Sequence, residues 1–200
     1  MFMESYYENC DFSSIKADFE ELGKVKFQKC SFRSADFSDI SINNCYFDTC
    51  DFTGSKLNSS TIKSSAFVNC IFRYANFFDA TLDDCKMIGS SFASAKLTAF
   101  TIIAGNWSYT VLTDVDFSNM TLSNINFEYA NLSNCNFTKS VISGCNFTNA
   151  KLTGTNFRSA DIRSSCIDNV DIMQMDMKGT KIDMEQAIII ARALGAKYEP

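Results

Sequence analysis

Large apolar residues recur at every fifth position along almost the whole chain. From Phe2 to Ile182 each of these positions holds Phe, Leu, Ile, Met, Tyr or Trp, with Ala17 as the one exception. Two residues before most of them lies a small residue, usually Ala, Cys, Ser or Thr. A period of five fits neither the 3.6-residue turn of an α-helix nor the two-residue alternation of a β-strand. The pattern therefore predicts a chain that turns a corner every five residues.

Four such corners close a coil of about 20 residues, a usual length for one repeat of a solenoid. Stacked coils would pair their backbones at about 4.8 Å, as neighbouring β-strands do. The large residue of each repeat then fills the interior, and the small residue fits beside it. A coil of this kind buries its apolar side chains only against the next coil. Residues 1–182 are accordingly predicted to form one β-solenoid domain.

Two segments strain this pattern. In residues 15–25 an interior position holds Ala17, and bulky or charged residues stand where small ones belong. The segment is either a distorted first coil or a projecting loop that keeps the register. In residues 99–107 the bulky Phe100 takes the place of a small residue. A bend, or a junction between two stacks of coils, is expected there.

The period changes after Ile182. Asp183 is a good N-cap with Gln186 three residues later, as in a capping box, and Gly195 is placed to end the helix. Residues 183–200 are predicted to hold a short α-helix that caps the open end of the solenoid through one stripe of residues: Met184, Ala187, Ile188, Ala191 and Leu194. A helix that is apolar outside this stripe as well needs a second partner, and the simplest one is its own copy in a twofold homodimer. The predicted dimer interface comprises Met184, Ala187, Ile188, Ile189, Ile190, Ala191, Ala193 and Leu194.

Composition narrows the chemistry. The chain of 200 residues has 18 Lys and Arg against 23 Asp and Glu, a net charge of −5, which argues against non-specific binding to DNA or to anionic membranes. It has no histidine, and eight of its nine cysteines fall in the column of small residues, where buried reduced thiols are expected. No nucleophile stands beside a base, and no glycine-rich phosphate loop or metal-ligand spacing occurs. We therefore expect no enzyme, no catalytic residue and no cofactor or metal site.

The ends and outer positions of the chain add three expectations. No apolar run is long enough to span a membrane, and the first residues lack the basic and apolar regions of a signal peptide, so a cytoplasmic protein is expected. Apolar residues at outward positions mark a possible contact patch of Val68, Ile71 and Ile88, with Tyr74 and Phe78 also nominally outward. An acidic group gathers near the C-terminus and consists of Asp161, Asp168, Asp171, Asp176, Asp183 and Glu185.

The repeat resembles that of the pentapeptide-repeat family, A(D/N)LXX. Clear units are Ala35-Asp36-Phe37-Ser38-Asp39 and Ala130-Asn131-Leu132-Ser133-Asn134. The resemblance implies an all-β solenoid, a right-handed quadrilateral β-helix, here of about nine coils with a short C-terminal α-helix. Within the family the chain is similar to the Qnr and MfpA type of quinolone-resistance proteins. That similarity rests on the length, on Asn106-Trp107-Ser108, and on the segment from Met177 to Ile182 followed by a helix.

The Qnr and MfpA resemblance also implies a function. Proteins of that type are dimeric rods that mimic duplex DNA and bind DNA gyrase or topoisomerase IV, which they protect from quinolones. The resemblance would place the acidic group at the contact with the topoisomerase. That contact would be mainly electrostatic, so salt should weaken it. Two other functions stay open: an immunity factor against a gyrase-targeting peptide toxin, and an interaction rod with an unrelated protein target.

Overall fold

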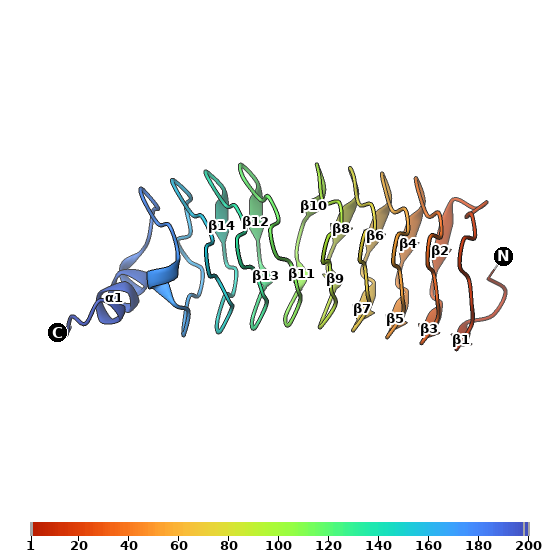
Figure 1. Cartoon of the computed structure of the whole chain (residues 1–200), viewed down its shortest axis with the longest axis horizontal. Coiled ribbons are helices and arrows are strands. Elements are labelled where there is room, and N and C mark those ends of the chain that lie inside the picture. Colours follow the sequence, from red (N-terminus) through yellow and green to blue (C-terminus); the bar gives the residue numbers. More distant parts are fainter. Residues whose placement is uncertain (1, 198, 200) are drawn as a thin grey trace. The chain divides into compact units, whose positions relative to one another are not determined.

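The computed structural model describes residues 2–197 and residue 199 (Figure 1). These residues fall into two compact units, Met1–Val111 and Leu112–Pro200. Both units are built from short parallel strands joined by tight turns, with one short α-helix near the C-terminus. The chain is therefore an all-β solenoid with a C-terminal helix, as its sequence period predicts. Its handedness, its quadrilateral form and the number of its coils stay predictions. The domain boundary at residue 182 is likewise a prediction, and the two outer limits of the predicted domains, residues 1 and 200, lie outside the described residues.

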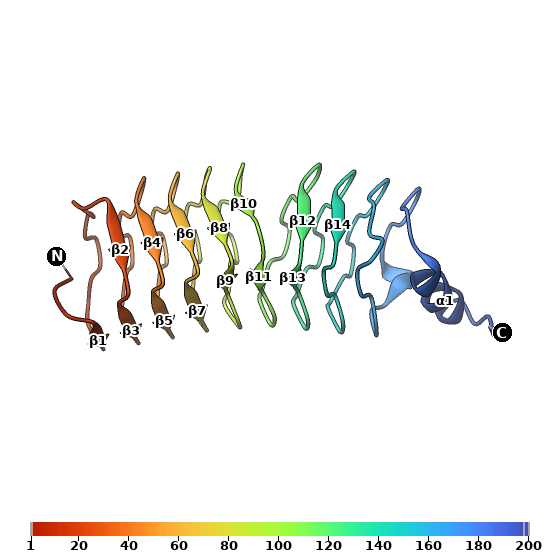
Figure 2. The same ribbon diagram turned by 180° about the vertical axis from the view of Figure 1, so that it is seen from behind.

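Unit 1 contains two parallel sheets, visible as two rows of short arrows in Figures 1 and 2. In each sheet the paired residues are 20 positions apart, so that Tyr7 pairs with Phe27, Phe27 with Phe47, and Phe47 with Phe67. One sheet of this unit consists of β1 (Tyr6–Glu8), β3 (Lys26–Gln28), β5 (Tyr46–Asp48), β7 (Ala66–Val68), β9 (Cys85–Lys86) and β11 (Gly105–Asn106). The other consists of β2 (Glu21–Gly23), β4 (Ser41–Asn43), β6 (Thr61–Lys63), β8 (Thr81–Asp83) and β10 (Thr101–Ile102).

The 20-residue offset stacks like side chains on each other in the interior. The ring centroid of Phe47 lies 5.0 Å from that of Phe27 and 4.5 Å from that of Phe67, and the ring planes are nearly parallel. A second column runs from Phe32 through Phe52 to Phe72 at 4.8 and 5.0 Å. All these rings are fully buried. Stacked aromatic pairs add about 0.5–1.5 kcal/mol beyond the burial of their area, so the columns hold successive coils together.

The irregular segment 15–25 follows the coil without a projecting loop. Lys16 bridges to Asp36 in parallel register, and β2 pairs with β4 immediately afterwards. Ala17 is half-buried, and the ring of Phe19 lies 5.9 Å from that of Phe2 in the same first turn. Of the two alternatives for this segment, the distorted coil is the one that the structure supports.

The second irregular segment, 99–107, also keeps its register. β10 pairs with β8, and β11 pairs with β9 through Gly105 and Cys85. Phe100 and Trp107 are both buried, so the bulky residue is taken into the core. Gly105 has φ +129°, and a side chain there would collide with the carbonyl oxygen of Cys85. The boundary between the two compact units lies shortly after this segment, at 111/112.

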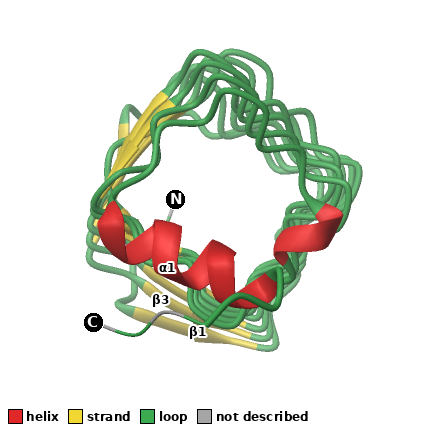
Figure 3. Ribbon diagram, turned by 90° about the vertical axis from the view of Figure 1, so that its left-hand side faces the viewer, coloured by secondary structure: helices red, strands yellow, loops and turns green. Residues whose placement is uncertain are grey.

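Unit 2 repeats the same construction and then changes to helix. β12 (Thr121–Ser123) pairs with β14 (Val141–Ser143), and β13 (Ile125–Asn126) bridges to Asn146. The rings of Phe117, Phe137 and Phe157 stack at 4.7 and 4.8 Å. The unit ends with the 3-10 helix η1 (Ile172–Gln174) and with α1 (Met184–Ala193), drawn in red in Figure 3. No helix among the described residues is long and apolar enough to cross a membrane.

Candidate interaction surfaces

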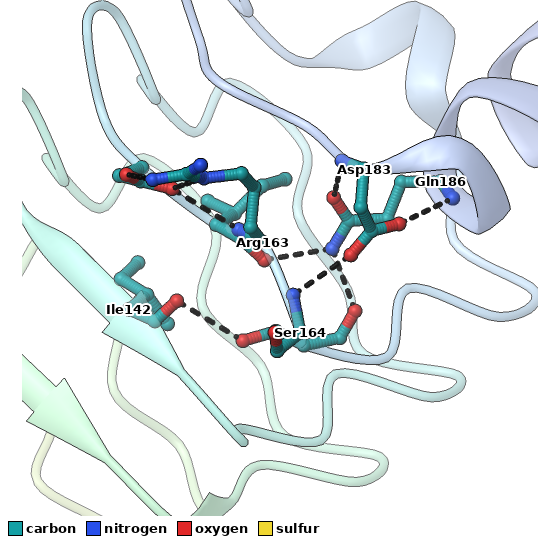
Figure 4. Close-up of polar contacts among 8 residues, drawn as sticks. Ile142, Arg163, Ser164, Asp183 and Gln186 are labelled. Carbon is teal, nitrogen blue, oxygen red and sulfur yellow. Dashed lines mark hydrogen bonds and ion pairs between the residues drawn. The ribbon is translucent and has the colours of Figure 1, made fainter.

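The docking of α1 depends on one buried polar side chain. Gln186 is 1% exposed, and its Nε2 donates to the carbonyl oxygens of Ile162 and Ser165, each at 2.7 Å (Figure 4). Its Oε1 accepts from the backbone N–H of Asp183 at 3.1 Å, and its own N–H donates to Asp183 Oδ1 at 3.0 Å. The predicted capping box is therefore present. The amide also satisfies two carbonyls of the last coil, a role that the sequence analysis did not assign to Gln186.

The apolar stripe predicted to cap the solenoid is wrong at both of its ends. Met184 is 74% exposed and Leu194 is 65% exposed, so neither covers the coils within the chain. The reason is that buried Gln186, rather than Met184, faces the last coil, which turns the start of the helix. Half-buried residues lie between these ends: Ala187, Ile188, Ile189, Ile190 and Ala191, while Ala193 is exposed. Met173 of η1, an element that contacts α1, is 67% exposed. An exposed apolar surface therefore remains at this end of unit 2.

The acidic group of unit 2 is spread over successive segments of the coil. Asp161 bridges to Lys181 and Asp176 to Asn156, while Asp168 follows the bridge of Cys166 to Asn146. Each pairing belongs to a different five-residue segment, so these carboxylates do not form one stripe. What the structure does bring together is Asp168, Asp183 and Glu185, which line one cavity of about 220 Å³ at the N-terminus of α1.

Most carboxylates of this group already hold the backbone. Asp183 accepts from the N–H groups of Ser164 and Gln186, and these bonds lower its pKa. Arg163 donates two side-chain hydrogen bonds to the Asp161 carboxylate, at 2.8 and 2.7 Å, and these bonds lower the pKa of Asp161. Asp171 caps η1, and Asp176 accepts from Lys178 N and pairs with Arg158. Asp168 and Glu185 are exposed, and neither accepts a backbone hydrogen bond that holds a turn.

The preference of the repeat for Asp or Asn before each interior residue has a local cause. At this position the side chain accepts from the backbone N–H two residues later, as in Asp51 with Thr53 at 2.8 Å and Asn146 with Thr148 at 3.0 Å. Such an Asx turn shapes the corner, and the residue after the N–H donor has a left-handed φ, +70° at Gly54 and +57° at Asn149. Many surface carboxylates of this chain are thus required by the turn itself.

The apolar patch predicted on unit 1 is only partly exposed. Ile71 is 45% exposed, whereas Val68 and Ile88 are half-buried. Two aromatic residues that follow Ile71 are exposed as well: Tyr74 is 58% exposed and Phe78 is 43% exposed. The outward apolar surface of this coil therefore continues from Ile71 toward Phe78.

The cysteines behave as small core residues. Seven are buried, and only Cys10 and Cys166 are partly exposed. Burial raises the pKa of Cys85 and of Cys135 to about 12, which keeps both thiols protonated at neutral pH. Among the described residues, no group of three or more Cys, Asp or Glu side chains could hold a metal ion.

These observations define a β-solenoid of five-residue repeats with a helical end. The chain belongs to the pentapeptide-repeat family: residues 20–85 match its pentapeptide repeat region, and residues 110–149 and 140–179 match its eight-copy pentapeptide repeats. No curated protein matches the chain at a significant level.

Solved structures show the same fold. A trypsin-treated variant of QnrB1, described as a plasmid-mediated fluoroquinolone resistance protein, superposes with a TM-score of 0.82 and 22% identity, covering 97% of each chain. Full-length QnrB1 superposes with a TM-score of 0.79 and 23% identity, covering 96% of this chain and 100% of its own. In both superpositions the likeness covers nearly the full length of each chain.

Proposed function

We propose that this protein binds DNA gyrase or topoisomerase IV and protects the enzyme from quinolones. The observation that carries the proposal is the end-to-end likeness to QnrB1, a fluoroquinolone resistance protein. The net charge of −5 agrees with a protein that takes the place of DNA on a basic surface. The protein would act by binding, without catalysis.

The finer features of the predicted architecture belong to the same proposal. We infer a right-handed quadrilateral β-helix of nine coils over residues 1–182, followed by a dimerising segment over residues 183–200. The exposed side chains of Met173, Met184 and Leu194 support a twofold homodimer, because apolar side chains grouped at one end of a unit favour a partner surface. The substitution Leu194→Glu should then give a monomer in analytical ultracentrifugation, whereas Met3→Glu, also at an exposed site, should leave the dimer intact.

Within the acidic group, the carboxylates without a structural task are the best candidates for the contact. Asp168 and Glu185 are exposed and line the same cavity, and Asp183 adds a third negative charge beside them. A twofold dimer through α1 would double these charges around its centre. An exposed charge contact of this kind weakens as salt rises, because the Debye length falls to about 8 Å at physiological ionic strength.

The test is gyrase supercoiling in the presence of ciprofloxacin, titrated with the protein at low and at high salt. Rescue of supercoiling is expected at low salt and should weaken at high salt. The double variant Asp168→Asn with Glu185→Gln should shift the half-maximal rescue concentration upward. The control is Asp39→Asn with Asp79→Asn, which removes the same charge from exposed corner positions of unit 1. Equal loss in both double variants, or no rescue by the unmodified protein, would contradict the proposal.

A further inference from the structure

One turn of unit 1 carries three exposed apolar side chains where its neighbours carry polar ones. Ile71, Tyr74 and Phe78 are 45%, 58% and 43% exposed. The residues at the same register one coil before and one coil after are small or polar: Asp51 and Ser91, Gly54 and Ser94, Asn58 and Thr98. The fold therefore does not require an apolar side chain at any of the three positions. Tyr74 also occupies a corner with φ +59°, a conformation that a bulky residue adopts at some cost.

Two cations lie over these rings. The guanidinium of Arg73 is 4.9 Å from the ring centroid of Tyr74, and its Nη2 donates to the Tyr74 hydroxyl at 3.1 Å. The ammonium of Lys96 is 5.1 Å from the ring centroid of Phe78. We call these four residues together with Ile71 the aromatic corner. A cation–π contact at an exposed site orients the charge and leaves it accessible, and Arg73 and Lys96 are both exposed.

Arg73 lacks the carboxylate that its position has elsewhere in the solenoid. Arginines directly after an interior residue pair with a nearby aspartate: Arg33 with Asp51 at 2.7 Å and Arg158 with Asp176 at 3.3 Å, each 18 positions later. Arg163 has Lys181 at that offset and pairs instead with Asp161, two positions earlier, at 2.7 Å, where Arg73 has Ile71. The residue 18 positions after Arg73 is Ser91. The guanidinium consequently turns to Tyr74 and keeps its charge without a carboxylate partner among the described residues.

Lys96 shows the same omission. Lys56 pairs with Asp36, which lies one coil earlier at the same register, at 3.2 Å. For Lys96 the residue at that place is Asn76, to which its backbone bridges. In the described part of the chain, neither Arg73 nor Lys96 therefore forms an ion pair with a carboxylate, and each lies instead over an exposed ring.

We propose that the aromatic corner binds a segment of a partner protein that carries carboxylates beside an aliphatic or aromatic side chain. The apolar side chain of the segment would pack on Ile71, Tyr74 and Phe78, and its carboxylates would take the places that Ser91 and Asn76 leave without charge. Aromatic and arginine side chains dominate the energy of protein interfaces, which suits this set. A nucleic acid fits less well, because the corner offers only two cations and Asp79 stands directly beside Phe78. This surface is independent of the topoisomerase contact proposed for unit 2.

The test is selection from a random 12-residue peptide library on the immobilised full chain, followed by affinity measurement of the selected peptides. Enrichment of Asp or Glu next to an aliphatic or aromatic residue is expected. Each test variant takes the residue of a neighbouring coil, so that the fold tolerates it: Tyr74→Ser, Phe78→Asn and Arg73→Thr. Each should raise the Kd of a selected peptide at least about tenfold.

The matched control is Tyr46→Ala. Tyr46 is 38% exposed, lies beside Lys26 at 5.4 Å, and has Ala66 at the same register on the next coil. Its substitution should leave the Kd unchanged, and thermal melts should show that all variants are folded. Selected peptides without an acidic residue, or equal loss in Tyr46→Ala, would overturn the proposal. A single-stranded DNA 20-mer is the competing ligand. If it bound more tightly than the peptides and Arg73→Thr abolished that DNA binding, the proposal would also be overturned, because the ligand class would then be a nucleic acid.

Discussion

The helix α1 should be held to the solenoid mainly by Gln186, and the substitution Gln186→Ala measures how strongly. The side chain makes three hydrogen bonds, two to carbonyls of the last coil and one from Asp183 N. At about 1 kcal/mol net for each bond, the docked helix should lose about 3 kcal/mol. A change of this size lowers the docking equilibrium constant about 100-fold.

Hydrogen exchange followed by mass spectrometry is the appropriate assay, because it reports local opening rather than global unfolding. In Gln186→Ala the amides of Met184–Ala193 should lose about 100-fold of their protection, while those of unit 1 stay unchanged. Gln174→Ala is the control, since Gln174 makes one side-chain bond, to Asp171, and is exposed. Gln186→Glu keeps the acceptor for Asp183 N but loses both donors, so it should not rescue protection. Full protection in either Gln186 variant would refute the reasoning.

The same contact should depend on acid. The N–H groups of Ser164 and Gln186 hold the pKa of Asp183 below its ordinary value. A group whose pKa is lowered by folding contributes stability that is present above its unfolded pKa, about 3.9, and is lost as pH falls through the folded pKa. Protection of α1, corrected for the intrinsic exchange rate, should therefore fall below about pH 4. Asp183→Asn retains a capping oxygen and should lose this pH dependence.

Three further results are expected. Gly105→Ala should lower the free energy of unfolding by about 2 kcal/mol or more in urea titration, because the methyl group meets the backbone of the neighbouring coil at a left-handed φ, whereas Gly23→Ala should not. Phe47→Ala should cost about 3–5 kcal/mol in the same titration, because it removes a fully buried ring from a stacked column; a loss below 1 kcal/mol would contradict the packing. With a thiol reagent, Cys10 and Cys166 should react in the native protein, and the seven buried cysteines only after unfolding; fast reaction of all nine would contradict the burial.

The solenoid could be predicted because its signal is repeated. One five-residue period over 180 residues fixes which side chains face inward, and errors at single positions such as Phe100 do not shift the register. The orientation of α1 could not be predicted in the same way. Apolar periodicity placed Met184 and Leu194 against the coils, but two carbonyls at the end of the stack require a donor, and Gln186 supplies it. A hydrogen-bond requirement at one site leaves no periodic trace in the sequence.

The aromatic corner could be predicted only in part from the sequence. Outward apolar residues at Ile71, Tyr74 and Phe78 stand out from the repeat, but the sequence analysis gave weight to Val68 and Ile88, which are half-buried. What distinguishes the corner is a comparison between coils, since Arg73 meets Ser91 where Arg33 meets Asp51. A missing carboxylate partner can be recognised in the sequence only after the structure has given the pairing offsets of 18 and 20 residues.

The same comparison bears on how surface charge should be assigned in this fold. An aspartate before an interior residue accepts the N–H that shapes the next corner, so its presence follows from the turn and says little about a partner. Neutral Asn performs this task equally well at many repeats, as Asn146 does. Only charges beyond that requirement, such as Asp168 and Glu185, or cations left without their usual carboxylate, such as Arg73, carry information about binding. A partner of this solenoid should therefore be sought through the few side chains that its repeat does not need.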